Sequence, residues 1–139
     1  MDYPSELFLK YHYAETKDLL KTFLTLLSAT LVLSIAFAEK IVEFKDSTRL
    51  AKTLLMSCWI GLIVSIVLCG LSICTIALAG GASLSDLYVK ATVINPDVFF
   101  WAYYSIGFAL WAGAFFVLAL ILMILAAAQS MWKEKALPQ

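Results

Sequence analysis

Charged residues are scarce in this chain, which has 139 residues, 14% of them charged and 63% hydrophobic. An average soluble domain is about 25% charged and about 45–50% apolar. A small soluble domain has too high a surface-to-volume ratio to bury so much apolar surface. Ten basic residues balance ten acidic ones, so there is no basic excess of the kind that nucleic-acid binding relies on. The composition excludes a soluble globular domain, a disordered chain and a nucleic-acid-binding protein.

The residue types of catalytic and metal sites are equally few. His12 is the one histidine, and its polar surroundings predict a solvated side chain rather than a ligand. No Ser/His/Asp set, glycine-rich phosphate loop or pair of carboxylates within an apolar segment can be assembled, so we predict no enzymatic activity and no cofactor. Cys58, Cys69 and Cys74 fall within one apolar window and are predicted to be small apolar residues, not disulfide partners.

Three long windows contain no charged residue. They cover residues 22–38, 53–85 and 98–132, which are 17, 33 and 35 residues. A membrane-spanning helix needs about 20 apolar residues, so each window fits one span, and the longer two are too short for two spans and a turn. We predict an all-α integral membrane protein with three transmembrane helices, a long helical hairpin followed by a third span. Residues 1–139 would form a single membrane domain.

Local signals set the predicted helix boundaries. An amphipathic N-terminal segment over 4–18, either on the membrane surface or packed on a partner, leads into a first helix over 19–45. The second helix is predicted over 47–79, because Gly80-Gly81 is typical of a helix end. A connection over 83–95 would follow, with Ser85 or Asp86 capping one short helical turn. Asn95-Pro96-Asp97 then predicts the start of a third helix over 96–133.

Aromatic residues mark both ends of the third helix. Tryptophan and tyrosine concentrate at membrane–water interfaces, so the predicted interface anchors are Trp101, Tyr103, Tyr104 and Trp132. The helix between Trp101 and Trp132 would be about 46 Å long, against about 40–45 Å for a bilayer with its headgroups. The third helix is therefore predicted to cross from one interface to the other.

Small residues at four-residue spacing predict close helix packing. On the second helix they are Ser57, Gly61, Ser65 and Cys69, and on the third they are Ser105, Ala109 and Gly113. Such a strip either packs within one chain or mediates self-association through a right-handed crossing of two helices. The sequence leaves both readings open. If a strip mediates self-association, the opposite face of the third helix is expected to meet lipid, and its residues are Phe115, Phe116, Leu118, Leu122 and Met123.

The turn between the first two helices is strongly charged. Lys45, Asp46 and Arg49 lie in this tip, over 39–52, which we predict to be exposed and available to a protein partner. Three spans would place the tip and the C-terminus on one side, with six basic residues against four on the other. Cytoplasmic segments carry more Lys and Arg, so the tip and the C-terminus are predicted to be cytoplasmic.

The runs LLSATLVLSIAFAEKI at 26–41 and LLMSCWIGLIVSIVLCGLS at 54–72 resemble small uncharacterised bacterial membrane proteins built from a long hairpin and a third span. The resemblance implies a bacterial inner-membrane location and carries no activity with it.

Two functions are consistent with the small size of the chain, the lack of a recognisable catalytic set and the strips of small residues. The first is a non-enzymatic homo-oligomer in the lipid bilayer, acting as a small pore or as a membrane-perturbing effector in stress or phage defence. The second is an accessory subunit of a larger membrane complex. The first predicts a self-associating particle, and the second predicts a monomer once the partner is removed.

Overall fold

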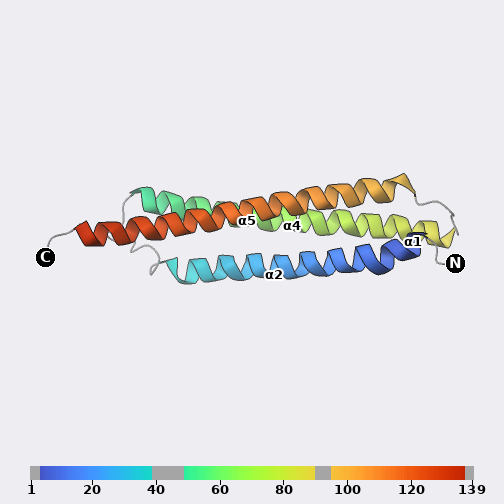
Figure 1. Ribbon diagram of the computed structural model, residues 1–139, viewed down its shortest axis with the longest axis horizontal. Coiled ribbons are helices and arrows are strands. Elements are labelled where there is room, and N and C mark those ends of the chain that lie inside the picture. The colour runs from blue at the N-terminus through green and yellow to red at the C-terminus, as the bar shows by residue number, and fades with distance from the viewer. Residues whose placement is uncertain (1–3, 39–48, 90–94, 137–139) are drawn as a thin grey trace. The chain divides into compact units, whose positions relative to one another are not determined.

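The chain is built of long helices (Figure 1). The computed structural model describes residues 4–38, 49–89 and 95–136, with the side chains of 130–136 excepted. The first helical stretch consists of α1 (Pro4–Leu7), the π-helix η1 (Phe8–Tyr13) and α2 (Ala14–Ala36). It is followed by α4 (Arg49–Tyr88) and α5 (Pro96–Ala136). Three helices in this described part are long and apolar enough to cross a membrane, which confirms the predicted helical class.

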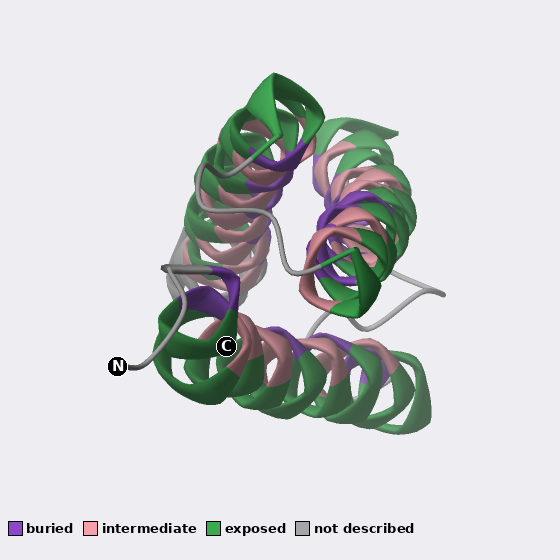
Figure 2. Ribbon diagram, turned by 90° about the vertical axis from the view of Figure 1, so that its right-hand side faces the viewer, coloured by how far each residue is buried: buried purple, intermediate pink, exposed green. Residues whose placement is uncertain are grey.

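Two compact units divide the chain. The first unit comprises Met1–Thr25 and Val67–Ala112, and the second comprises Leu26–Ile66 and Gly113–Gln139. Each unit therefore contains a part of α2, a part of α4 and a part of α5. Along each helix the buried residues follow one side of the ribbon and the exposed residues the other (Figure 2).

The π-helix η1 changes the register of the first helical stretch. Three fully or nearly buried positions on α2 lie seven residues apart: Leu20, Leu27 and Ser34. Half-buried Tyr13 continues this spacing, but the buried residues before it, Phe8 and Ser5, lie five and eight positions earlier. One π-turn accommodates one more residue than an α-turn, so η1 supplies the extra position and leaves Glu6 exposed. The predicted continuation of this helix to residue 45 lies outside the described residues.

The predicted end of the second helix at Gly80-Gly81 is wrong, because α4 continues to Tyr88. A glycine inside a helix lowers helix stability by about 1 kcal/mol relative to alanine. α4 contains no proline and tolerates this cost. Gly80 has a packing role instead. A Cβ atom there would lie 2.7 Å from Cε2 of Tyr13, so the tyrosine ring occupies the space that any larger side chain would need. Residues 83–88 of the predicted connection are consequently helical.

Two hydrogen bonds link the end of α4 to the start of α5. The backbone N–H of Asn95 donates to Oδ2 of Asp86 at 2.8 Å, and Oδ1 of Asn95 accepts from the N–H of Asp97 at 3.1 Å. The second bond is the N-cap predicted for α5. Asp86 is not the cap of a short helical turn, as the sequence suggested, because it lies within α4. Its carboxylate instead holds the residue that begins the next helix.

The neighbouring glycines of α4 generate a paired prediction. Gly80→Ala should lower the free energy of unfolding relative to Gly81→Ala by about 1 kcal/mol or more, since overpacking costs typically 1–3 kcal/mol. A methyl group at Gly81 meets nothing within 4 Å and should be neutral or stabilising. Denaturant titration in detergent, followed by circular dichroism, measures both. Adding Tyr13→Ala should remove the penalty at Gly80, and equal stabilities of the two single variants would contradict the packing role.

Candidate functional site

The four residues of the predicted strip on α4 differ in burial. Ser65 and Cys69 are fully buried, Gly61 is half-buried and Ser57 is exposed. Ten buried residues along α4 instead alternate between spacings of four and three, and they are Ala51, Leu55, Cys58, Leu62, Ser65, Cys69, Ser72, Ile76, Ala79 and Ser83. Thr75 and Gly80 are buried beside this repeat. This average of 3.5 residues is typical of left-handed helix packing, whereas the predicted four-residue strip implied a right-handed crossing.

In the second unit, Gly61 lies against α5. A Cβ atom at Gly61 would be 3.3 Å from Cβ of Ala119 and 3.8 Å from the backbone oxygen of Phe115. Ala119 also forms a buried cluster with Cys58 and Leu62, on which Phe116 and Met123 pack. The expectation that Phe116 and Met123 face away from the packed side of α5 is therefore wrong. Gly61 serves helix packing within the chain.

In the first unit, α4 and α5 exchange hydrogen bonds between two buried serines. Oγ of Ser72 donates to the backbone oxygen of Ser105 at 2.7 Å, and Oγ of Ser105 donates to the backbone oxygen of Ser72 at 2.9 Å. Both hydroxyl groups are thus satisfied without water. Among the predicted residues of α5, Ser105 is the one that this contact buries completely.

A second polar contact in the first unit joins α4 to α2. The thiol of Cys69 donates to the backbone oxygen of Leu20, with the sulfur and oxygen 3.5 Å apart. Cys58 and Cys69 are buried and Cys74 is exposed, and all three are free thiols. The Cys69 contact places Leu20 opposite Cys69, which fixes the register between the two helices in this unit.

Alanine supplies most of the buried positions on α5. These positions are seven residues apart and are Val98, Ser105, Ala112, Ala119 and Ala126. The predicted Ala109 is half-buried, and a methyl group at the predicted Gly113 would meet nothing within 4 Å. Ala112, Ala119 and Ala126 are not among the predicted packing residues, although their seven-residue repeat with Ser105 is visible in the sequence.

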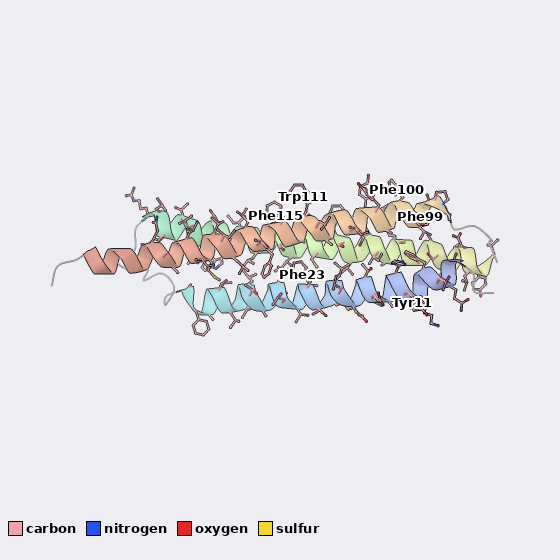
Figure 3. All side chains as sticks on the ribbon, viewed as in Figure 1. Tyr11, Phe23, Phe99, Phe100, Trp111 and Phe115 are labelled. Atoms are coloured by element: carbon pink, nitrogen blue, oxygen red, sulfur yellow. The ribbon has the colours of Figure 1, made fainter. Side chains whose placement is uncertain are left out.

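The aromatic residues at the start of α5 form a chain of ring contacts. The ring of Phe100 contacts Trp101 at 5.4 Å and Tyr104 at 4.7 Å between centroids. Of the predicted anchors, Tyr103 is 76% exposed, Tyr104 is 45% exposed and Trp101 is half-buried. Phe100 and, further along, Trp111 extend outward from α5 (Figure 3). Trp132 lies on α5, but its side chain is outside the described part of the chain.

The predicted tip is described at one position. Arg49 is exposed and is the first residue of α4. Lys45 and Asp46 lie outside the described residues, so the predicted partner contact remains a prediction. Within the described part of the chain, no group of three or more His, Cys, Asp and Glu residues is placed to hold a metal ion.

Charges on α2 lie beside charge-free parts of α4 and α5 in the first unit. Tyr13 of η1 contacts Gly80, and Leu20 contacts Cys69, so α2 follows α4 between these two contacts. Over this length α4 has no charged residue, and α5 has none between Val98 and Ala112. The neighbouring turns of α2 carry four charged residues, which are Glu15, Lys17, Asp18 and Lys21. One helix of the unit thus carries charged side chains on its outer face, beside the 71% exposed Leu19, where the other two carry none.

The outer surfaces of α4 and α5 in this unit expose large apolar side chains. Leu78 is 52% exposed, Phe100 is 53% exposed and Trp111 is 64% exposed. Glu15, Asp18 and Lys21 are exposed on α2, while the ammonium group of Lys17 lies over the ring of Tyr13, 5.5 Å from its centroid. The first unit therefore presents two chemically different surfaces to its surroundings.

No family model, curated protein or solved structure matches this chain.

The contact of Gly61 with Ala119 allows the packing role of Gly61, a member of the predicted strip on α4, to be tested. Gly61→Leu should destabilise the chain by about 1–3 kcal/mol or more, because the added side chain meets Ala119. Gly70→Leu is the matched control, since a Cβ atom there meets nothing within 4 Å. Unfolding in detergent, monitored by helicity, measures both variants. A Gly61→Leu chain as stable as the Gly70→Leu chain would argue that Gly61 packs elsewhere.

The serine exchange predicts that each hydroxyl stabilises the contact between α4 and α5. Ser72→Ala and Ser105→Ala should each lower the free energy of unfolding by about 0.6 kcal/mol, with about 1.7 kcal/mol as the upper bound for such bonds between membrane helices, because each removes one bond to the backbone of the facing helix. Thr25→Ala should change stability little, because the Thr25 hydroxyl donates to the backbone oxygen of Lys21 in its own helix. Serine variants as stable as the Thr25→Ala chain would contradict the exchange.

Proposed function

We propose that this chain is an integral membrane protein of the bacterial inner membrane that works as a homo-oligomer without enzymatic chemistry. Its proposed activity is that of a small pore or a membrane-perturbing effector in stress or phage defence. Support for the membrane location comes from three helices that are long and apolar enough to cross a bilayer. Support for self-association comes from the polar outer face of α2.

The observation that carries the proposal is the contrast within the first unit. A charged side chain at the centre of a bilayer costs about 2.5–3.5 kcal/mol on insertion scales, so Asp18 and Lys21 require water or a polar partner. The exposed side chains of Leu78, Phe100 and Trp111 on α4 and α5 require an apolar environment instead, since apolar surface is stabilised away from water. A single copy surrounded by lipid has a favourable environment for the apolar surfaces of α4 and α5 and an unfavourable one for the charged face of α2.

Self-association resolves this contrast. Copies that turn their α2 helices toward one another keep Glu15, Asp18 and Lys21 in a shared polar interior and leave the outer surfaces of α4 and α5 to lipid. With three or more copies, such an interior becomes a hydrated path lined by charged and hydroxyl side chains, including Thr22 and Thr25. Lumen-lining charges of this kind set selectivity in channels.

The proposed topology follows from the positive-inside rule. The tip over 39–52 and the C-terminus together carry six basic residues, against four for the N-terminal segment and the second connection. We therefore place the tip and the C-terminus in the cytoplasm. The charged tip, with Arg49 exposed at the start of α4, is then the surface proposed to receive a protein partner.

The mass of the purified protein in detergent, with bound detergent subtracted, tests the proposal. We expect a particle of several chains, and after reconstitution into sealed vesicles we expect release of a trapped ion. An oligomer in tight vesicles would retain self-association and reject the pore. A monomer at all concentrations would reject the homo-oligomer and favour the accessory-subunit reading, in which the polar face of α2 meets a different protein.

A further inference from the structure

Two opposite charges stand next to each other on the outer face of α2 in the first unit. Asp18 and Lys21 are both exposed, and a spacing of three residues places them on the same side of a helix. Within the described part of the chain, neither side chain forms an ion pair. The two charges are thus available to groups outside the chain.

Their depth follows from the contact between α2 and α4. Leu20, between the two charges in sequence, accepts the hydrogen bond of Cys69. Cys69 is the midpoint of the charge-free window over 53–85, with sixteen residues to either end. The hydrocarbon core of a bilayer is as thick as about 20 helical residues are long, so a core centred on Cys69 places Asp18 and Lys21 near its middle, where an unpartnered charge is most costly.

We propose that the occupant of this face is a neighbouring copy of the same chain, with Asp18 of each copy paired to Lys21 of the next. This inference rests on the proposed self-association and names its surface. A symmetric contact repeats each interaction, so Asp18 and Lys21 of each copy both find a partner, and exposed Glu15, one turn earlier on α2, is left to the hydrated interior. The flexible four-carbon chain of lysine spans the single helical turn between the two positions.

The other side chains on this face are compatible with a close contact. The hydroxyl of Thr22 donates to the backbone oxygen of Asp18 at 2.9 Å, and the hydroxyl of Thr25 donates to the backbone oxygen of Lys21 at 3.0 Å. Both hydroxyls are therefore satisfied within the helix, and both side chains are small enough to let two backbones approach. Lys17 is not needed for the contact, because its ammonium group lies over the ring of Tyr13.

Charge-reversal variants test the pairing between copies. Asp18→Lys leaves two positive charges on the face, and Lys21→Asp leaves two negative ones, so each variant alone should self-associate at least about tenfold more weakly than the natural chain. Co-expression of the two variants with different affinity tags should restore association, detected by capture on one tag and blotting for the other. Glu6→Lys makes the same change of charge on an exposed side chain away from this face and should associate normally.

The possible results distinguish a wrong contact surface from a wrong proposal of self-association. Weak association of both single variants and its recovery in the mixture would support the pairing. If the natural chain is oligomeric and both single variants associate as strongly as it does, the surface is wrong and the proposed function stands. If the natural chain is monomeric in the same assay, the proposed function itself fails. Circular dichroism of all variants confirms that the helices are intact.

Discussion

Close approach between helix backbones is the constraint on which the packing of this chain depends. The buried positions of α5 are mostly alanines at a seven-residue repeat, and those of α4 are mostly small residues, with leucine or isoleucine at three positions. Small side chains make two things possible: the methyl group of Ala119 reaches Gly61, and the hydroxyls of Ser72 and Ser105 reach backbone oxygens on the facing helix. Where helices lack a solvent-driven reason to associate, such contacts hold them together.

Much of the helical framework is predictable because it depends on local chemistry. The charge-free windows predict three long helices, and Asn95-Pro96-Asp97 predicts the start of α5, whose N-cap bond is present. The end of α4 was mispredicted because Gly80-Gly81 carries the local signal of a helix end, while the role of Gly80 depends on Tyr13, which is distant in sequence. A glycine that ends a helix and a glycine that admits a ring look identical in one sequence.

The candidate surface was less predictable than the helices. Of the predicted strip of small residues on α4, Gly61, Ser65 and Cys69 serve packing within the chain or lie buried in it, whereas Ser57 is exposed. The polar face of α2 was visible in the sequence, but its significance depends on what lies beside it. Contacts of Leu20 with Cys69 and of Tyr13 with Gly80 are needed to align the charges of α2 with the apolar stretches of the other two helices.

The π-helix η1 also says something about how the length of this chain can vary. The segment Phe8–Tyr13 holds one residue more than an uninterrupted α-helix would need to keep Ser5 and Tyr13 on the same side. A related sequence lacking one residue within this segment would run as a plain α-helix, with the same side chains turned inward on both sides of the deletion. The first helical stretch therefore contains a place where evolution can add or remove a single residue without disturbing what the rest of the helix packs against.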